Sequence, residues 1–272
     1  MVKRSTKIIV GIILACLTMI SIFPFWLMFS MSTYKSEMIF QNNPIIPSNY
    51  FIENIKTIMA SNFLQSYGNS LYVSVFSMVA GVLVCSMVGY GMYAYNFKWK
   101  NGLQVFIMLT MMVPAQIGII GYMIEMRNMG INNTLLPLIF TWLANGFGAY
   151  WMISFVRQSV PMELIESARI DGANEIRIFS SIVFPCIKPG IVTLSLLLFL
   201  WSWNNYMVPL VFINKQENYT IPIFVKSLAS AFRTDYGAQL AGLTLATIPL
   251  LIIFIIGSKS LINGLTAGAV KG

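Results

Sequence analysis

The ionisable side chains that usually carry out chemistry are scarce in this chain. Its 272 residues include 9 Asp and Glu, 17 Lys and Arg, 3 Cys and no His. Its long apolar stretches hold no charged residue, whereas proton- and ion-coupled carriers generally need an ionisable group in the membrane, at an insertion cost of about 2.5–3.5 kcal/mol. No Gly-x-x-x-x-Gly-Lys-Ser/Thr phosphate loop occurs, and the cysteine spacing matches no metal site. Any energy that drives this chain therefore has to arrive through a partner.

One long polar interval has the pattern of folded structure. It is residues 161–190, PMELIESARIDGANEIRIFSSIVFPCIKPG, which we call the coupling segment. Pro161 suits the start of a helix, where its missing N–H costs nothing. Gly172 tolerates the positive φ of a helix end, and Asn174 can cap a second helix. We therefore expect a short helix, a tight turn and another short helix, with small residues at the bend where a second chain could approach closely.

The coupling segment resembles the EAA-type motif of ABC-importer permeases, the binding-protein-dependent transport system permease family. The likeness is to the carbohydrate-uptake, maltose-type class. The matching positions are Glu166, Ala168, Asp171, Gly172, Ala173, Phe179, Ile182 and Pro185. Ser167 departs from the motif, because the family usually has Ala there, but Ser is nearly as small. The stretches LWSWNNYMVPLVF at 200–212 and GLTAGAVKG at 264–272 are similar to the same class.

The resemblance implies a role for each matching position and a set of partners. Contact with an ATPase subunit is expected from Glu166, Ser167, Ala168, Asp171, Gly172, Ala173, Phe179, Ile182 and Pro185. Glu166 is expected to hold the angle of the segment by a hydrogen bond or ion pair, with nearby Arg169 or with a residue of a partner protein. The implied partners are a second permease subunit in a heterodimer, two ATP-binding subunits, an extracellular sugar-binding protein and membrane lipid. ATP and Mg²⁺ would be bound by the partner subunits. This chain itself is expected to hold no catalytic residue, cofactor, metal or nucleic acid.

A second group of residues is a candidate for the path of the transported sugar, with oligosaccharides as the expected class. Aromatic faces can stack on sugar rings, and amides can bond to hydroxyls. The candidates are Trp201, Trp203, Asn204 and Asn205 in the fifth apolar stretch and Gln116 in the third. The alternative is structural: the tryptophans lie at helix contacts, the amides hold a bend before Pro209, and the partner permease holds the whole sugar site.

Composition predicts the fold class independently. The chain is 57% hydrophobic and 10% charged, with a mean hydropathy of +0.74, whereas soluble domains have about 25% charged residues. Six apolar stretches reach the roughly 20 residues that a spanning helix needs: 8–29, 71–95, 103–124, 134–156, 189–213 and 238–258. We expect an all-α polytopic membrane protein with six transmembrane helices and a cytoplasmic helix-turn-helix coupling loop. The first stretch is interpreted as a retained anchor, because it is too long for a signal peptide and no cleavage site follows.

The distribution of Lys and Arg predicts the orientation. With the N-terminus inside, inner segments hold 11 of the 17 basic residues and outer segments hold 6. Both termini and the coupling segment should then lie on the cytoplasmic side of a bacterial plasma membrane. The net charge of +8 reflects this topology and not nucleic-acid binding. The expected parts are an N-terminal segment, first helix and outer loop at 1–66, a five-helix permease core at 67–262 and a cytoplasmic tail at 263–272.

Three functions are compatible with these features. The first is a permease subunit of an ABC importer, the second a stand-alone channel or secondary carrier, and the third a structural or assembly protein. The motif favours the first, and the lack of intramembrane charge disfavours the second. Purified chain in liposomes would separate them, because a channel or carrier moves solute unaided whereas a permease subunit is inert without its partners.

Overall fold

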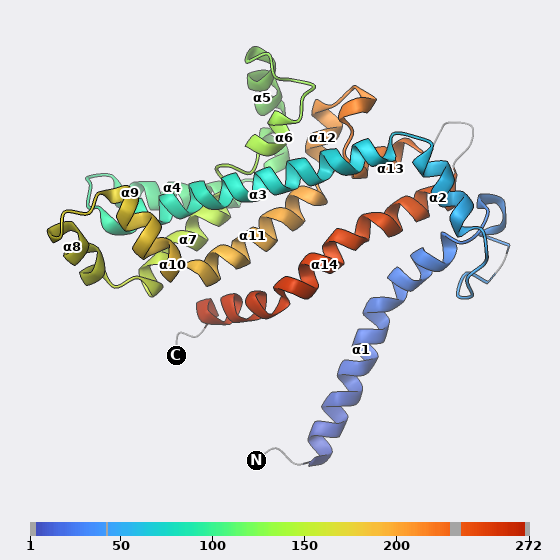
Figure 1. The fold of residues 1–272 in the computed structure, drawn as a ribbon, viewed down its shortest axis with the longest axis horizontal. Helices are drawn as coiled ribbons and strands as arrows, with labels where there is room; N and C mark the ends of the chain where they lie inside the picture. The colour runs from blue at the N-terminus through green and yellow to red at the C-terminus, as the bar shows by residue number, and fades with distance from the viewer. Residues whose placement is uncertain (1–3, 42, 229–234, 270–272) are drawn as a thin grey trace. The chain divides into compact units, whose positions relative to one another are not determined.

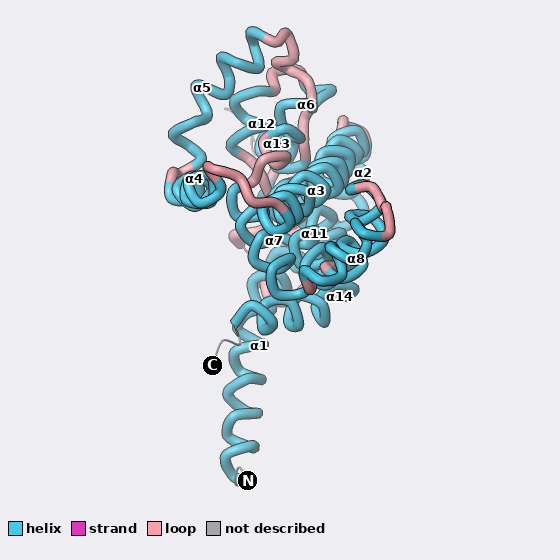
Figure 2. The backbone as a smooth tube through the Cα atoms, turned by 90° about the vertical axis from the view of Figure 1, so that its left-hand side faces the viewer, coloured by secondary structure: helices cyan, strands magenta, loops and turns pink. Residues whose placement is uncertain are grey.

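The computed structural model describes residues 4–41, 43–228 and 235–269. Every regular element in these residues is a helix (Figure 1), and no strand is drawn among them in Figure 2. The all-α prediction is therefore confirmed. The chain divides into two compact units, and each is described by itself. Unit 1 comprises Met1–Gln65 and Ile223–Ile248, and unit 2 comprises Ser66–Pro222 and Pro249–Gly272.

Unit 1 contains the first predicted span and the segment that follows it. Its elements are α1 (Arg4–Met31), η1 (Ser36–Met38), α2 (Phe51–Met59), most of α13 (Ile221–Ser227) and the first part of α14 (Tyr236–Ala269). Asn54 of α2 is buried, and its Nδ2 donates to the carbonyl oxygens of Ser32 at 2.8 Å and Tyr34 at 2.9 Å. These bonds satisfy backbone acceptors just after α1 and fix the turn there.

Unit 2 is built around α3 (Phe63–Ala94), which belongs to it from Ser66 onward. Its other elements are α4 (Lys100–Met112), α5 (Ala115–Asn128), α6 (Leu136–Phe140), α7 (Gly146–Ser159), α8 (Met162–Ile170), α9 (Glu175–Ile178), η2 (Phe179–Val183), α10 (Phe184–Cys186), α11 (Lys188–Trp203), α12 (Met207–Phe212) and η3 (Gln216–Asn218). One hydrophobic core joins α3, α7 and α11, with Cys85, Met152 and Leu194 almost fully buried in it.

Glycines on α3 allow it to pack closely in this core. A Cβ on Gly89 would lie 2.8 Å from the carbonyl oxygen of Met152 in α7, and a Cβ on Gly81 would lie 2.8 Å from that of Trp142. Both distances are shorter than van der Waals contact, so only glycine fits at these positions. Close backbone approach through small residues is typical of helix packing in membranes.

The third predicted span is interrupted at Pro114. Val113 is extended, with ψ of 120°, because the ring of Pro114 disfavours helical backbone in the residue before it. The break turns α5 by 103° from α4, so that α5 runs away from α4 in Figure 2. This bend is much sharper than an ordinary kink within one span.

The number of spans in the described residues is smaller than the six expected from apolar length. Thr6–Met31, Phe63–Ala94 and Tyr236–Ser258 are long and apolar enough to cross a membrane, and counting two bent helix pairs raises the number to five. The stretch 134–156 is divided between α6 and α7, because Asn145 caps α7 with its Oδ1, which accepts from the Gly148 N–H at 2.8 Å. The six-span count stays a prediction. Within the predicted tail, α14 continues to Ala269 and residues 270–272 lie outside the described residues, so the placement of the tail in the cytoplasm also stays a prediction.

Candidate functional site

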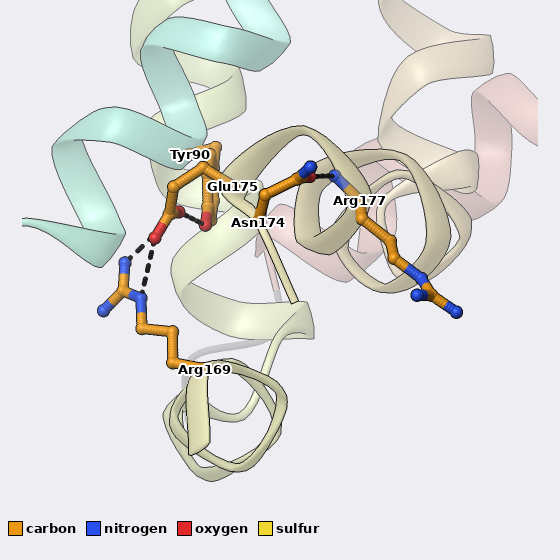
Figure 3. Close-up of polar contacts among 5 residues, drawn as sticks. All are labelled: Tyr90, Arg169, Asn174, Glu175 and Arg177. Atoms are coloured by element: carbon orange, nitrogen blue, oxygen red, sulfur yellow. Dashed lines mark hydrogen bonds and ion pairs between the residues drawn. The ribbon is translucent and has the colours of Figure 1, made fainter. Parts of the chain in front are cut away.

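The coupling segment forms the helix, turn and helix that its sequence predicts. Helix α8 ends at Ile170, and Gly172 follows with a φ of 76°. The Gly172 N–H donates to the Arg169 carbonyl at 3.1 Å, which satisfies one of the last acceptors of α8. Asn174 then starts α9, and its Oδ1 accepts from the Arg177 N–H at 2.9 Å (Figure 3). Both the glycine and the amide therefore have the local roles expected of them.

The second helix of the segment contains a π-helical turn, η2, which the sequence analysis did not foresee. The turn lies directly before α10, in which Pro185 is near the N-terminus. Proline provides no N–H for the carbonyl four residues earlier, and its ring clashes with that carbonyl in an α-helix. A wider turn at Phe179–Val183 removes this conflict and lets the chain continue into α10 without a break.

One side of the coupling segment is seated in the core of unit 2. Ile165, Ile178, Val183 and Ile187 are each at most 1% exposed. They belong to the same cluster as Met152 and Val156 of α7 and Tyr90 of α3. Figure 1 shows α8, α9 and α10 gathered at the C-terminal end of α3. Close-packed interiors have low compressibility and transmit strain, so this side of the segment is in firm contact with the helices of the core.

The positions expected to contact an ATPase subunit divide between the seated side and the exposed side. Glu166, Ser167, Asp171, Gly172 and Pro185 are exposed, Ala173, Phe179 and Ile182 are partly buried, and Ala168 is buried. Between the two short helices the surface is hollowed by a volume of about 320 Å³, lined by Ala168, Asp171, Ala173, Arg177, Ile178, Ser181 and Ile182. Asp171 and Gly172 form the turn after α8, and their exposure leaves the turn open to contact by another protein.

A polar network ties the two short helices to each other and to α3 (Figure 3). Arg169 Nε, from α8, lies 2.9 Å from Glu175 Oε1 in α9, and Arg169 Nη2 donates to Oε2 at 3.3 Å. The Tyr90 hydroxyl of α3 also donates to Glu175 Oε2. The Arg169 guanidinium lies over the Tyr95 ring, 5.1 Å from its centroid, at a distance typical of cation–π contacts.

This network fixes the charge of Glu175. Hydrogen bonds from the Arg169 guanidinium and then from the Tyr90 hydroxyl lower the pKa of the Glu175 carboxyl to about 2. Hydrogen bonding to the same carboxylate raises the pKa of Arg169. Both groups are therefore charged at neutral pH, and the pair holds α8 and α9 at one angle.

The network was missed in the sequence analysis, which paired Arg169 with Glu166 or gave Glu166 a partner in another protein. That first pairing is wrong: Arg169 binds Glu175, and Glu166 is exposed and makes no hydrogen bond or ion pair in the part of the chain described. The available signals were weak. Tyr90 lies near the end of the second apolar stretch, and Glu175 lies in the first turn of a capped helix, where a carboxylate suits the helix dipole.

The two tryptophans proposed to contact sugar have different surroundings. Trp203 is 3% exposed and packs between Phe199, with ring centroids 5.7 Å apart, and Tyr67, at 5.5 Å. Trp201 is partly buried, with its ring 6.3 Å from that of Trp142 and 5.4 Å from that of Phe147. Both lie at helix contacts, as the structural alternative expects, but Trp201 retains some accessible surface.

The two amides hold the break between α11 and α12. Asn204 Nδ2 donates to the Leu200 carbonyl at 2.8 Å, and Asn205 Oδ1 accepts from the Val208 N–H at 3.0 Å. Asn205 also lines a cavity of about 10 Å³, which is the size of one water molecule and far below that of a sugar pocket. Gln116 is exposed in the first turn of α5. Contact of these five residues with sugar stays a prediction.

Comparison with known proteins agrees with the motif. The profile of the family described as binding-protein-dependent transport system inner membrane component matches residues 81–265. The arabinooligosaccharides transport system permease protein AraQ of Halalkalibacterium halodurans is 29% identical, over 99% of this chain and 100% of the relative. The diacetylchitobiose uptake system permease protein DasC of Streptomyces coelicolor is 30% identical, over 92% of each chain.

The fold has a counterpart among solved structures. A chain from the crystal structure of a bacterial ABC transporter involved in the import of the acidic polysaccharide alginate superimposes with a TM-score of 0.82 at 21% identity, over 95% of this chain and 98% of that chain. At this identity the likeness concerns the fold alone. The family profile covers more than half of the chain and includes the whole coupling segment. This chain therefore belongs to the family of inner membrane components of binding-protein-dependent transport systems.

Proposed function

We propose that this chain is a permease subunit of an ATP-driven ABC importer of sugars, with oligosaccharides as the substrate class. It forms one half of the translocation pathway and receives the energy of ATP hydrolysis through residues 161–190. The family membership supports the transport function, and relatives named for arabinooligosaccharide and diacetylchitobiose transport support the substrate class.

One observation supports the coupling role: the coupling segment has one buried side and one exposed side. Its apolar side is seated in the core of unit 2 through Ile165, Ile178 and Val183, whereas its turn at Asp171 and Gly172 is exposed. A segment that is fixed to the transmembrane helices on one side and open on the other can bind a second protein and move the helices with it. A solvated loop without a buried side could not transmit such a movement.

The proposed assembly supplies what this chain lacks. A second permease of the same class completes the pathway as a heterodimer, two ATP-binding subunits bind ATP and Mg²⁺ and hydrolyse the nucleotide, and an extracellular binding protein delivers the sugar. This subunit is not itself an enzyme. In the plasma membrane both termini and the coupling segment face the cytoplasm, following the excess of basic residues. Within the pathway, Trp201 is the tryptophan with accessible surface for sugar contact, and Asn204 and Gln116 are exposed as well.

Two substitutions at Gly172 test the coupling role. A Cβ at Gly172 would meet no atom within 4 Å, but the φ of 76° is unfavourable for a β-branched side chain. Gly172→Val should therefore distort the turn, with near-normal expression because the site lies outside the bilayer. Gly172→Asn is the matched control for conformation, since Asn adopts positive φ readily yet adds a side chain at the docking surface.

The measurement is co-purification of the ATP-binding subunits together with sugar uptake, in cells that co-express the cognate subunits. We expect Gly172→Val to lose most ATP-binding subunit and to abolish uptake. If the turn shape alone matters, Gly172→Asn should retain both; if the bare backbone also contacts the partner, Gly172→Asn should lose both. Full uptake by Gly172→Val would overturn the coupling role.

A further inference from the structure

Helix α3 is bonded at its C-terminal end to the coupling segment. The Tyr90 hydroxyl donates to Glu175, whose other partner is Arg169 of α8. One turn later, the Tyr93 hydroxyl donates to the Val160 carbonyl, directly before α8, at 2.8 Å. The Tyr90 ring also packs on Phe179, with ring centroids 5.7 Å apart. Both short helices and the connection that leads into them are thus attached to the same end of α3.

The other end of α3 within unit 2 is bonded to residues 213–221, which we call the η3 segment. Asn69 Nδ2 donates to the carbonyl oxygens of Glu217 at 2.8 Å and Tyr219 at 3.0 Å. The buried Ser70 hydroxyl accepts from the Ile221 N–H at 2.8 Å. Three backbone groups of the η3 segment are therefore satisfied by two neighbouring side chains of α3.

Between these two attachments α3 is a single unbroken helix with no proline. Tyr90 lies 20 residues after Ser70, a rise of about 30 Å at about 1.5 Å per residue, which matches the hydrocarbon thickness of a bilayer. Gly81 and Gly89 pack it against neighbouring backbone. Because α3 is continuous, lacks the proline that would kink it and is closely packed, strain applied at one end can pass along it to the other.

We propose that α3 transmits the displacement of the coupling segment to the η3 segment, and that Tyr90, Glu175 and Arg169 are positioning residues for this transmission. The inference rests on the proposed function, in which ATP-binding subunits move the coupling segment. Binding of nucleotide on the cytoplasmic side then changes the conformation of the opposite side without contact between them. The coupling passes through named hydrogen bonds, so removing one bond should weaken it while leaving the coupling segment folded.

The test uses the complete transporter in lipid nanodiscs. Residue Gln216 of η3 is exposed and is replaced by Cys for an environment-sensitive fluorophore, with Cys16→Ser, Cys85→Ala and Cys186→Ser as the background. The signal is compared without nucleotide and with ATP, Mg²⁺ and vanadate. We expect Tyr90→Phe, which removes one hydroxyl and keeps the ring on Phe179, to reduce this nucleotide-dependent change and the sugar transported per ATP by about threefold or more.

Two further variants separate transmission from general damage. Tyr72→Phe makes the same chemical change on the same helix, where the Tyr72 ring lies 4.5 Å from that of Phe76 and its hydroxyl has no hydrogen bond in the described residues; its signal should be that of the parent. Asn69→Ala removes the two hydrogen bonds that this side chain of α3 donates to the η3 segment. It should reduce the signal at residue 216 while ATP-binding subunits still co-purify and hydrolyse ATP.

The outcomes distinguish this inference from the function it rests on. An unchanged signal at residue 216 in both Tyr90→Phe and Asn69→Ala, with ATP-binding subunits bound, would overturn the role of α3 and leave the permease function intact. Loss of ATP-binding subunits from Tyr90→Phe would also overturn it, because the network would then build the docking surface. Absence of ATP-binding subunits from the parent complex would refute the proposed function instead.

Discussion

Single residues in the coupling segment have separable roles. Gly172 sets the shape of the turn through its positive φ, Asn174 starts the second helix through its side chain, and Glu175 joins two helices to α3. Glu166, in contrast, is exposed. The acidic residue that matches the family motif and the acidic residue that holds the segment together are therefore different residues.

The charge of Glu175 predicts how stability depends on pH. Its pKa is lowered from 4.5 to about 2 in the folded chain, so the ionised carboxylate contributes stability above pH 4.5. This contribution is lost as the pH falls from about 4.5 through about 2. Glu175→Gln lacks it at every pH. We expect the apparent melting temperature of the parent in detergent to exceed that of Glu175→Gln by a constant margin from pH 8 to pH 5, and the margin to shrink below pH 4.5. A margin that stays constant down to pH 2.5 would contradict this assignment.

Glu166 provides a contrasting prediction. Because its side chain is exposed, Glu166→Ala should change the free energy of unfolding by no more than about 0.5 kcal/mol. A contact with a partner protein is then the remaining physical reason for lower uptake. We expect uptake to fall less than in Gly172→Val, with ATP-binding subunits still bound. Thermal unfolding of the variant and uptake in cells are the measurements. A large drop in melting temperature would show that Glu166 acts within the chain.

At the scale of elements, the sequence predicts what depends on neighbours along the chain. The turn at Gly172 and the cap at Asn174 depend on backbone preferences of a few residues, and both were predicted. The interruption at Pro114 follows from the same kind of local preference, but the 103° bend there does not, because the angle depends on how α5 packs in unit 2. Likewise, the contact between Tyr90 and Glu175 joins residues far apart in sequence, and no local preference encodes it.

The close packing of α3 on α7 predicts opposite effects of one substitution at two nearby glycines. Gly89→Ala places a methyl group 2.8 Å from the backbone of Met152 and should destabilise the protein by about 1–3 kcal/mol. Gly91→Ala meets no atom within 4 Å and should be neutral or stabilising by up to about 1 kcal/mol, because Ala favours helix. Apparent melting temperatures in detergent measure both. Equal shifts for the two variants would mean that α3 and α7 are not in close contact.

At the scale of the whole molecule, composition and motif were sufficient for the fold class and the family. The low share of charged residues predicted a helical membrane protein, and the motif at 166–185 predicted the family that the comparisons show. The number of spans was less predictable, because apolar length alone cannot distinguish one crossing from two helices joined at an angle. The stretch at 134–156 is divided by the cap at Asn145, which a hydropathy window does not detect.

The orientation of the whole chain is open to direct measurement. Single cysteines at Ser5, Lys215 and Lys271, in a background without native cysteines, should differ in their access to a membrane-impermeant thiol reagent. We expect Lys215→Cys to be labelled from outside intact cells, and Ser5→Cys and Lys271→Cys to be labelled only after the membrane is permeabilised, because basic residues favour the cytoplasmic side. Labelling of either terminal position from outside would refute the predicted topology.

The hydrogen bond between Tyr90 and Glu175 can form only some time after Tyr90 has been translated. About 85 residues separate them in the sequence, which corresponds to about 4–17 s of translation at about 5–20 residues per second. During this interval the ribosome makes α4 to α8, and the Tyr90 hydroxyl cannot yet bond to Glu175. The bond therefore forms only in a nascent chain that already contains α3, α7 and both short helices. A chain that ends before Glu175 therefore contains all of α3 but lacks the acceptor of the Tyr90 hydroxyl.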